Sequence, residues 1–184
     1  MREEAERDER LRGEESPAAV ESAREPIPSP VVSPRIVISK GQRRLVLYAG
    51  EKVLRTYRIA LGRHPTGDKT REGDGRTPEG EYYLTHKNRD SKYYLSLGLS
   101  YPNAGDAARG LADGVITQTQ HDAIVGAIER KERPPWDTAL GGEVFIHGGG
   151  ATRDWTVGCI ALDDEGIREL FEAIEVGTPV IIEP

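Results

Sequence analysis

The chain contains a single cysteine, Cys159, and a histidine, His147, that precedes it by twelve positions. A thiol beside an imidazole can act as a nucleophile with its base, and pairing of the thiolate with the imidazolium lowers the thiol pKa. A connection of this length can fold back on itself, so that a histidine ending one strand reaches a cysteine that starts the next segment. We therefore identify Cys159 as a candidate nucleophile and His147 as its proton acceptor and donor.

The residues just before Cys159 could stabilise the negative charge that forms during acyl transfer. Successive backbone N–H groups in a turn such as Val157-Gly158-Cys159 can converge on one oxyanion. Gly158 has no side chain and leaves room for a substrate carbonyl group. The pattern therefore predicts cysteine-dependent acyl transfer, with backbone N–H groups of this turn, which includes Gly158 and Cys159, as possible donors to the oxyanion.

Two other interpretations fit parts of this pattern. A lone cysteine followed by the apolar segment 160–162 is commonly a small buried hydrophobic residue. Three glycines after a histidine also occur in the oxyanion hole of lipase-like esterases, but the nearest match to the required Gly-x-Ser-x-Gly elbow, residues 98–102, lacks its second glycine. The alternating strand and helix pattern of that fold is also missing. The esterase interpretation is therefore excluded, whereas an inert cysteine remains an alternative.

The elements that must position these residues are mainly strands. β-branched, partly alternating runs separated by glycine-containing turns predict an antiparallel meander over 35–39, 43–48 and 52–59, and further strands are expected at 81–86, 142–147 and 179–182. One helix is predicted to begin with a capping box at Thr119 and Asp122. A second should follow Asp163 as N-cap and stop at Gly177, because apolar residues between them repeat at helical spacing. The sequence thus predicts a mainly β fold with two or three helices.

The N-terminal segment differs in composition from the rest of the 184 residues. Residues 1–34 hold nine Asp or Glu, five Lys or Arg, five prolines and no aromatic residue, so they cannot bury enough surface to offset chain entropy. This segment carries −4 of the formal net charge of −6. We expect an acidic, proline-containing tail or linker at 1–34 and one folded domain at 35–184, without a secretory signal in the tail.

Composition excludes several classes of function. A negative net charge without a Lys/Arg cluster is the opposite of a nucleic-acid-binding surface. No apolar run approaches the roughly 18 residues needed to cross a bilayer. One cysteine allows neither an internal disulfide nor a zinc site with several thiolates. We therefore expect no nucleic-acid partner, no integral membrane segment and no metal, and we take a monomer as the default.

The two motifs resemble those of the L,D-transpeptidase catalytic domains, also called YkuD domains, of bacterial cell-wall enzymes. In that family a His-Gly pair is followed after a short loop by Ser/Thr-x-Gly-Cys, as in residues 147–148 and 156–159 here. Residues 61–63, 77–83 and 176–182 also resemble flanking segments of the family, and residues 154–159 resemble an Asp-Trp-Thr-x-Gly-Cys subgroup. The resemblance covers roughly 35–183 and implies the family's mixed β-sandwich or barrel.

The resemblance also implies roles for individual residues. Cys159 would form a thioester with a peptidoglycan stem peptide, and His147 would move the proton while the Gly148 backbone carbonyl orients the imidazole. The acyl group would then pass to an amine, or to water in a carboxypeptidase or amidase. The family implies no metal or organic cofactor, and its substrate implies a periplasmic or cell-wall location. A cell-wall-binding module without a working nucleophile is the alternative outside the enzymes.

Two positions depart from the family's pattern. Many members have a histidine and an arginine where this chain has Val157 and Ala161. An arginine elsewhere, Arg63 or Arg153, could then bind a substrate carboxylate. Trp155 could shield the thiolate or line the acyl-donor pocket, and we add Thr156 as the fourth candidate substrate-binding residue.

Overall fold

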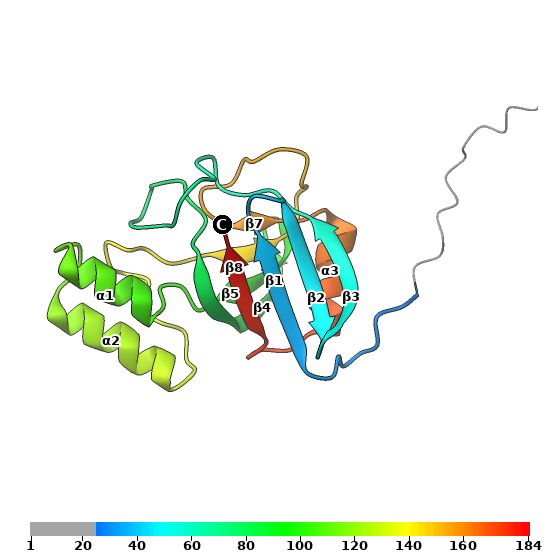
Figure 1. Ribbon diagram of the computed structural model, residues 1–184, viewed down its shortest axis with the longest axis horizontal. Coiled ribbons are helices and arrows are strands. Elements are labelled where there is room, and N and C mark those ends of the chain that lie inside the picture. The colour runs from blue at the N-terminus through cyan, green and yellow to red at the C-terminus, as the bar shows by residue number, and fades with distance from the viewer. Residues whose placement is uncertain (1–24) are drawn as a thin grey trace, which may run out of the picture.

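A computed structural model describes residues 25–184 and contains one curled sheet of eight strands (Figure 1). The order across the sheet is β3-β2-β1-β8-β4-β5-β6-β7. The strands span β1 Pro34–Ser39, β2 Arg44–Ala49, β3 Lys52–Arg58, β4 Gly80–Ser91, β5 Tyr94–Leu99, β6 Phe145–His147, β7 Ile160–Ala161 and β8 Pro179–Glu183. The expectation of a mainly β fold with two or three helices is confirmed.

The predicted meander is present, because β1, β2 and β3 pair antiparallel in sequence order. In β1, Ile36 and Ile38 point into the core while their neighbours are half-buried, which is the period of two expected for a strand with one buried face. The last strand, β8, lies between β1 and β4, parallel to the first and antiparallel to the second. The sheet is therefore completed by two segments that are more than 130 residues apart.

The sheet curls until the segment after β3 meets its far edge. Ala60 and Ala161 exchange two backbone hydrogen bonds of 2.8 and 2.9 Å, and Gly62 forms a bridge with Thr156. The apolar side chains inside this curl form the main core, which includes Leu45, Leu97 and residues of the last helix. The curl brings residues 60–62 against the segment that leads into β7.

Three helices accompany the sheet: α1 Ala104–Ala112, α2 Gln118–Glu129 and α3 Asp164–Ala173. The α3 helix buries Ile167, Leu170 and Phe171 in the main core, and Asp163 caps its first turn as predicted. The α1 and α2 helices lie together on the other side of the molecule and have a small apolar cluster of their own (Figure 1).

Three local predictions differ from the structure. The capping box of α2 uses Thr117 and Gln120, two residues earlier than the predicted Thr119 and Asp122. The strand expected at 142–147 is only Phe145–His147, because Glu143 adopts a positive φ of 53° that interrupts extended backbone. The α1 helix and β5 lie in segments for which the sequence predicted neither a helix nor a strand.

The first described residues lie along α3. Val31 is buried in the main core, and its N–H donates to the Ala173 carbonyl at 3.3 Å. Ser29 donates to the Glu172 carbonyl. Val31, which lies within the predicted tail, thus packs on the domain, because it supplies apolar surface in an otherwise polar segment. The remainder of the predicted tail, residues 1–24, lies outside the described residues.

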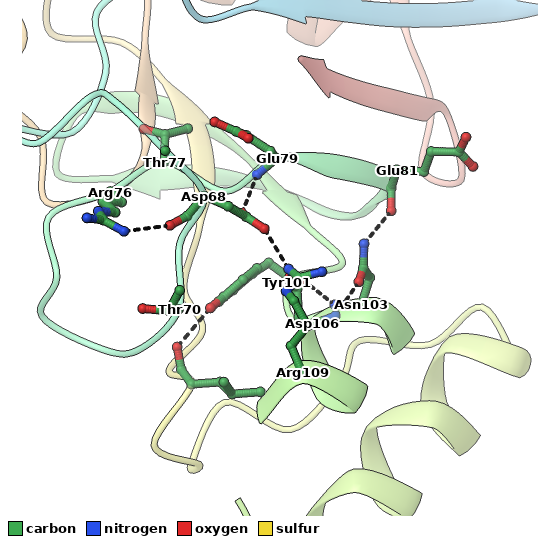
Figure 2. Close-up of polar contacts among 12 residues, drawn as sticks. Asp68, Thr70, Arg76, Thr77, Glu79, Glu81, Tyr101, Asn103, Asp106 and Arg109 are labelled. Atoms are coloured by element: carbon green, nitrogen blue, oxygen red, sulfur yellow. Dashed lines mark hydrogen bonds and ion pairs between the residues drawn. The ribbon is translucent and has the colours of Figure 1, made fainter. Parts of the chain in front are cut away.

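The long loop between β3 and β4 is anchored on both sides (Figure 2). Asp68 accepts a hydrogen bond of 2.7 Å from the Glu79 backbone N–H and pairs with Arg109 of α1 at 2.6 Å. Arg109 also pairs with the buried carboxylate of Asp106. On the sheet side, Lys40 pairs with Glu79 and donates to two carbonyl groups of the loop. These contacts fix the path of the loop past the segment before β7.

Candidate active site

The two candidate catalytic residues come from neighbouring parallel strands. In the pairing of β6 with β7, Ile146 lies opposite Ile160 and His147 opposite Ala161. Continuing this register by one residue places Cys159 opposite Phe145. Side chains alternate between the faces of a sheet, so Cys159 and His147 belong to the same face. The register therefore puts the two candidate catalytic residues on the same face of the sheet, at the two ends of the short loop between β6 and β7.

His147 is held in one orientation and one tautomer. Its Nδ1 lies 2.6 Å from the Gly148 carbonyl oxygen, which can only accept a hydrogen bond, so the proton resides on Nδ1 and Nε2 is the free base. Tyr93 stacks on the imidazole at a centroid distance of 4.6 Å, and Trp155 contacts it edge-on at 5.6 Å. Burial lowers the pKa of His147, although the hydrogen bond with Gly148 opposes this. The imidazole is therefore neutral at pH 7 and can accept a proton.

The thiol of Cys159 is also in its neutral form. Burial raises its pKa above the usual value. A backbone hydrogen bond with Phe145 and the charge of Lys69 lower the pKa, but by less than burial raises it. The Sγ atom lies 3.5 Å from the Glu143 carbonyl oxygen, an acceptor suited to S–H. Burial disfavours both charges, which works against the expected thiolate and imidazolium pair. The proton must move when the substrate is attacked.

The turn before Cys159 is organised by Thr156. The Thr156 hydroxyl donates to the Cys159 carbonyl at 2.7 Å and accepts from the Gly158 N–H at 3.2 Å. Gly158 has φ of 143°, and a Cβ there would lie 2.9 Å from the Arg76 carbonyl oxygen, so only glycine fits.

These contacts change two predictions. Thr156 is buried and both hydrogen-bonding functions of its hydroxyl are used within the turn, so in this structure it positions the backbone instead of facing substrate. The Gly158 N–H is likewise engaged, because the threonine oxygen precedes it by two residues and closes a local turn. The Cys159 N–H remains the candidate oxyanion donor in this turn.

Asp154 fastens the same loop to the sheet. It accepts hydrogen bonds from Arg43 and, at 2.9 Å, from the Leu61 backbone N–H. Burial alone would raise the pKa of this carboxyl, but these contacts outweigh it and lower the pKa. Together with the bridge between Gly62 and Thr156, the hydrogen bond from Leu61 holds the nucleophile loop against the segment after β3, and the ion pair fastens it to the turn between β1 and β2.

A cavity of about 340 Å³ opens beside Cys159. A cavity of this size is at the small end of known ligand sites. It is bordered by the loop after β3, the segment before β6 and the nucleophile turn: Lys69, Glu72, Gly73, Gly141, Gly142, Glu143, Val144, Val157, Gly158 and Cys159. A larger hollow of about 460 Å³ lies between β4, β8 and the α1–α2 pair and contains neither candidate catalytic residue.

The predicted substrate-binding residues do not line the cavity beside Cys159. Arg63 donates to the Trp155 carbonyl at 3.3 Å, and Arg153 is exposed on the loop between β6 and β7. The Trp155 indole N–H donates to the Gly150 carbonyl at 3.0 Å, and its ring covers His147. Trp155 therefore shields the base, whereas neither arginine is placed to meet a ligand in this cavity.

Two residues of the site were not predicted. Tyr93, which stacks on His147, comes from the segment just before β5, and its partner is more than fifty positions away in sequence. Lys69 is buried beside the cavity, although a lysine is rarely buried without a partner. The acidic residue Asp74, five positions later, is the signal that could have indicated a buried pair.

Within residues 25–184, no three His, Cys, Asp or Glu side chains are grouped so that they could hold a metal ion. The same part of the chain has no helix that is both long and apolar enough to span a membrane.

The sequence profile of the L,D-transpeptidase catalytic domain (YkuD) matches residues 33–182, which include every strand of the curled sheet except the last residue of β8, Glu183. The chain belongs to the L,D-transpeptidase catalytic domain family. This membership confirms the resemblance found in the sequence. The subgroup resemblance of residues 154–159 stays a prediction.

Among similar sequences is the Escherichia coli K12 protein named "Putative L,D-transpeptidase YafK", which is 29% identical over 166 residues. The match covers 86% of this chain and 53% of that protein, so the chain spans about half the length of this relative. Among solved structures, the helical cell shape determining protein Pgp2 from Campylobacter jejuni has a TM-score of 0.53 at 22% identity, with 84% of this chain and 51% of that chain covered.

The Bdellovibrio bacteriovorus protein Bd1075 has a similar fold, with a TM-score of 0.50 and 22% identity over 83% of this chain and 48% of that chain. At these identities the two structures support the fold alone.

Proposed function

We propose that this domain is a cysteine acyltransferase that acts on peptidoglycan stem peptides. The observation that carries the proposal is the placement of Cys159 and His147 on one face of two paired strands, with the imidazole fixed by Gly148. Family membership supplies the substrate class. Because peptidoglycan lies outside the cytoplasmic membrane, the proposal also places the activity there.

The reaction follows from the resting protonation states. His147 Nε2 takes the thiol proton as the Cys159 sulfur attacks the donor carbonyl, and the new oxyanion accepts a hydrogen bond from the Cys159 N–H. When the scissile C–N bond breaks, the imidazolium returns its proton to the departing amine. A thioester remains at Cys159.

The second half of the reaction reverses these roles. An acceptor amine loses a proton to His147 as it attacks the thioester, the C–S bond breaks, and the sulfur recovers the proton. Water can take the place of the amine, which would make the protein a carboxypeptidase or amidase. Transfer is the proposed reaction, and the products formed with and without an added amine distinguish the two.

The first experiment is intact-mass analysis after incubation with a carbapenem, whose strained amide resembles an acyl donor. We expect one covalent adduct per chain, none in Cys159→Ala, and slower formation in His147→Ala. His86→Ala is a matched control, because His86 is half-buried among aromatic residues but lies on β4 instead of β6. An adduct that persists in Cys159→Ala, or equal rates in the two histidine variants, would contradict the proposal.

Stem peptides then test the substrate. Incubation of the protein with a stem tetrapeptide should release the terminal amino acid in a Cys159-dependent reaction. If the carbapenem reacts but no stem peptide is processed, the nucleophile is established and the peptidoglycan substrate is wrong. If neither reacts and the thiol alkylates no faster than a buried cysteine, the domain is a binding module.

A further inference from the structure

A buried lysine lies beside the nucleophile. The Lys69 side chain is only 5% exposed, yet it lines the cavity that also contains Cys159. A charged ammonium group is not retained in such a place without partners. Its Nζ donates to the Arg71 carbonyl at 3.0 Å and pairs with Asp74 at 2.9 Å.

Asp74 is built to keep this lysine charged. Its carboxylate accepts hydrogen bonds from the backbone N–H groups of Thr70, Arg71 and Arg76 as well as from Lys69. Burial alone would raise the pKa of this carboxyl, but these donors outweigh burial and hold the pKa below its usual value. The loop therefore fixes an anion behind the ammonium group and orients it.

One N–H of the ammonium group is left over. An ammonium group has three N–H donors. Within residues 25–184, two of the Lys69 donors form hydrogen bonds, one with the Arg71 carbonyl and one with Asp74. Its Nζ lies 3.8 Å from the position that a Cβ would occupy on Gly158, so the ammonium group lies beside the nucleophile turn, and both border the same cavity. The remaining donor is thus available to a ligand in the cavity.

A second buried lysine shows the contrast. Lys40 is 2% exposed and anchors the same loop, but all three of its donors are used, by the Gly67 and Thr77 carbonyls and by Glu79. Lys40 does not line the cavity. A lysine that serves only to anchor this loop is therefore fully paired, and Lys69 is not.

The other charged residues around the cavity indicate what Lys69 would attract. Glu72 and Glu143 are exposed and negative, and among the described residues that border the cavity Lys69 is the one cation. The charge of Lys69 lowers the pKa of the Cys159 thiol, but by less than burial raises it. A ligand carboxylate would gain a charge-assisted hydrogen bond there.

We propose that Lys69 is a specificity-determining residue, which binds the terminal carboxylate of the donor peptide through its unpaired N–H while Asp74 holds it in place. This inference rests on the proposed function. In a donor whose last residue departs, the carboxyl carbon is two bonds from the scissile nitrogen. A carboxylate so close to the attacked carbonyl falls in the cavity that Lys69 and Cys159 share.

Binding measurements in a Cys159→Ala background test this without turnover. The probes are a stem tetrapeptide that ends in a free carboxylate and the same peptide with a terminal amide, titrated by calorimetry. We expect the carboxylate peptide to bind about 10- to 100-fold more tightly, as for a hydrogen bond to a charged group. Lys69→Met should reduce this ratio to about one, Lys69→Arg should keep part of it, and Lys40→Met should leave it unchanged.

Each outcome decides between alternatives. The inference is overturned if the ratio survives Lys69→Met, if Lys69→Met and Lys40→Met weaken both peptides equally, or if neither peptide binds. Urea unfolding of each variant identifies any that fails to fold, and the comparison of the two peptides in the Lys69→Arg protein then serves in place of Lys69→Met. A Lys69-dependent preference without Cys159-dependent release of the terminal residue would support the inference and overturn the proposed function.

Discussion

The replacement of Thr156 by valine tests the account of the nucleophile turn. Valine has nearly the shape of threonine but no hydroxyl, so it removes the bonds to the Cys159 carbonyl and the Gly158 N–H. Thr156 and Gly158 are buried, and water cannot readily replace either bond. A buried polar group left without a partner costs about 1–3 kcal/mol, so two such groups should lower the free energy of unfolding by about 2–4 kcal/mol.

Thr156→Ser is the matched control. It keeps the hydroxyl and removes one methyl group, which should cost about 1 kcal/mol. With a urea dependence of about 2 kcal/mol per molar, the valine variant should unfold at about 1–2 M less urea than the wild-type protein and the serine variant at about 0.5 M less. Carbapenem acylation should slow at least about tenfold in the valine variant, because the sulfur is no longer fixed by its own backbone.

The assay pairs urea unfolding with the rate of adduct formation at several carbapenem concentrations. Loss of the turn lowers the limiting rate, whereas loss of a substrate contact raises the concentration needed for half of that rate. If the valine and serine variants unfold at the same urea concentration and only the apparent carbapenem affinity falls in Thr156→Val, the hydroxyl contacts ligand and the reasoning about the turn is refuted.

Three further predictions concern pH and the loop. Because burial lowers the pKa of His147, the acylation rate should stay constant from pH 7 to below pH 6.5. Because burial raises the pKa of Cys159, labelling of the thiol by iodoacetamide should accelerate only above pH 9. A labelling midpoint below pH 7 would instead reveal a thiolate and imidazolium ion pair. Gly158→Ala should abolish acylation, because the new methyl group would clash with the Arg76 carbonyl oxygen and the positive φ would cost a further strain of about 1–3 kcal/mol. Gly150→Ala is the control, because Gly150 also has a positive φ but lies in open space, so this variant should keep its activity. Equal activities of the two variants would contradict the clash. Asp154→Asn should lower the free energy of unfolding by about 1–3 kcal/mol at pH 7. The difference from the wild-type protein should shrink below pH 3.8, because the carboxylate stabilises the fold above its unfolded pKa and loses this effect as pH falls through its lowered folded pKa. A difference that does not change with pH would exclude the ionised pair as its cause.

The sequence predicted best those elements whose stability is local. The meander has alternating apolar residues and glycine turns, and α3 has both an N-cap and a helical apolar repeat, so neighbouring residues specify each. The α1 helix is different, because two of its nine residues are glycine and its cap lies in a tight turn after Pro102. Its contacts with α2 and with Leu140 stabilise it, and these lie outside the helix's own residues.

The candidate site divides in the same way. The spacing of His147 and Cys159 predicted that a short loop could join them, and the paired strands place them on one face. Their protonation states could not be predicted, because burial by Tyr93 and Trp155 arises only after the sheet has curled. The role of Lys69 was hidden for a similar reason, since its burial depends on a loop anchored from β1 and α1.

The central position of β8 has a consequence for how the protein is made. Before residues 179–183 leave the ribosome, β1 and β4 each lack a neighbour, so the meander and the strands that carry the active site are two separate sheets with unpaired edges. Exposed edges of this kind favour pairing between chains. Synthesis of the final strand therefore joins the halves and ends the interval in which the nascent domain is prone to aggregate.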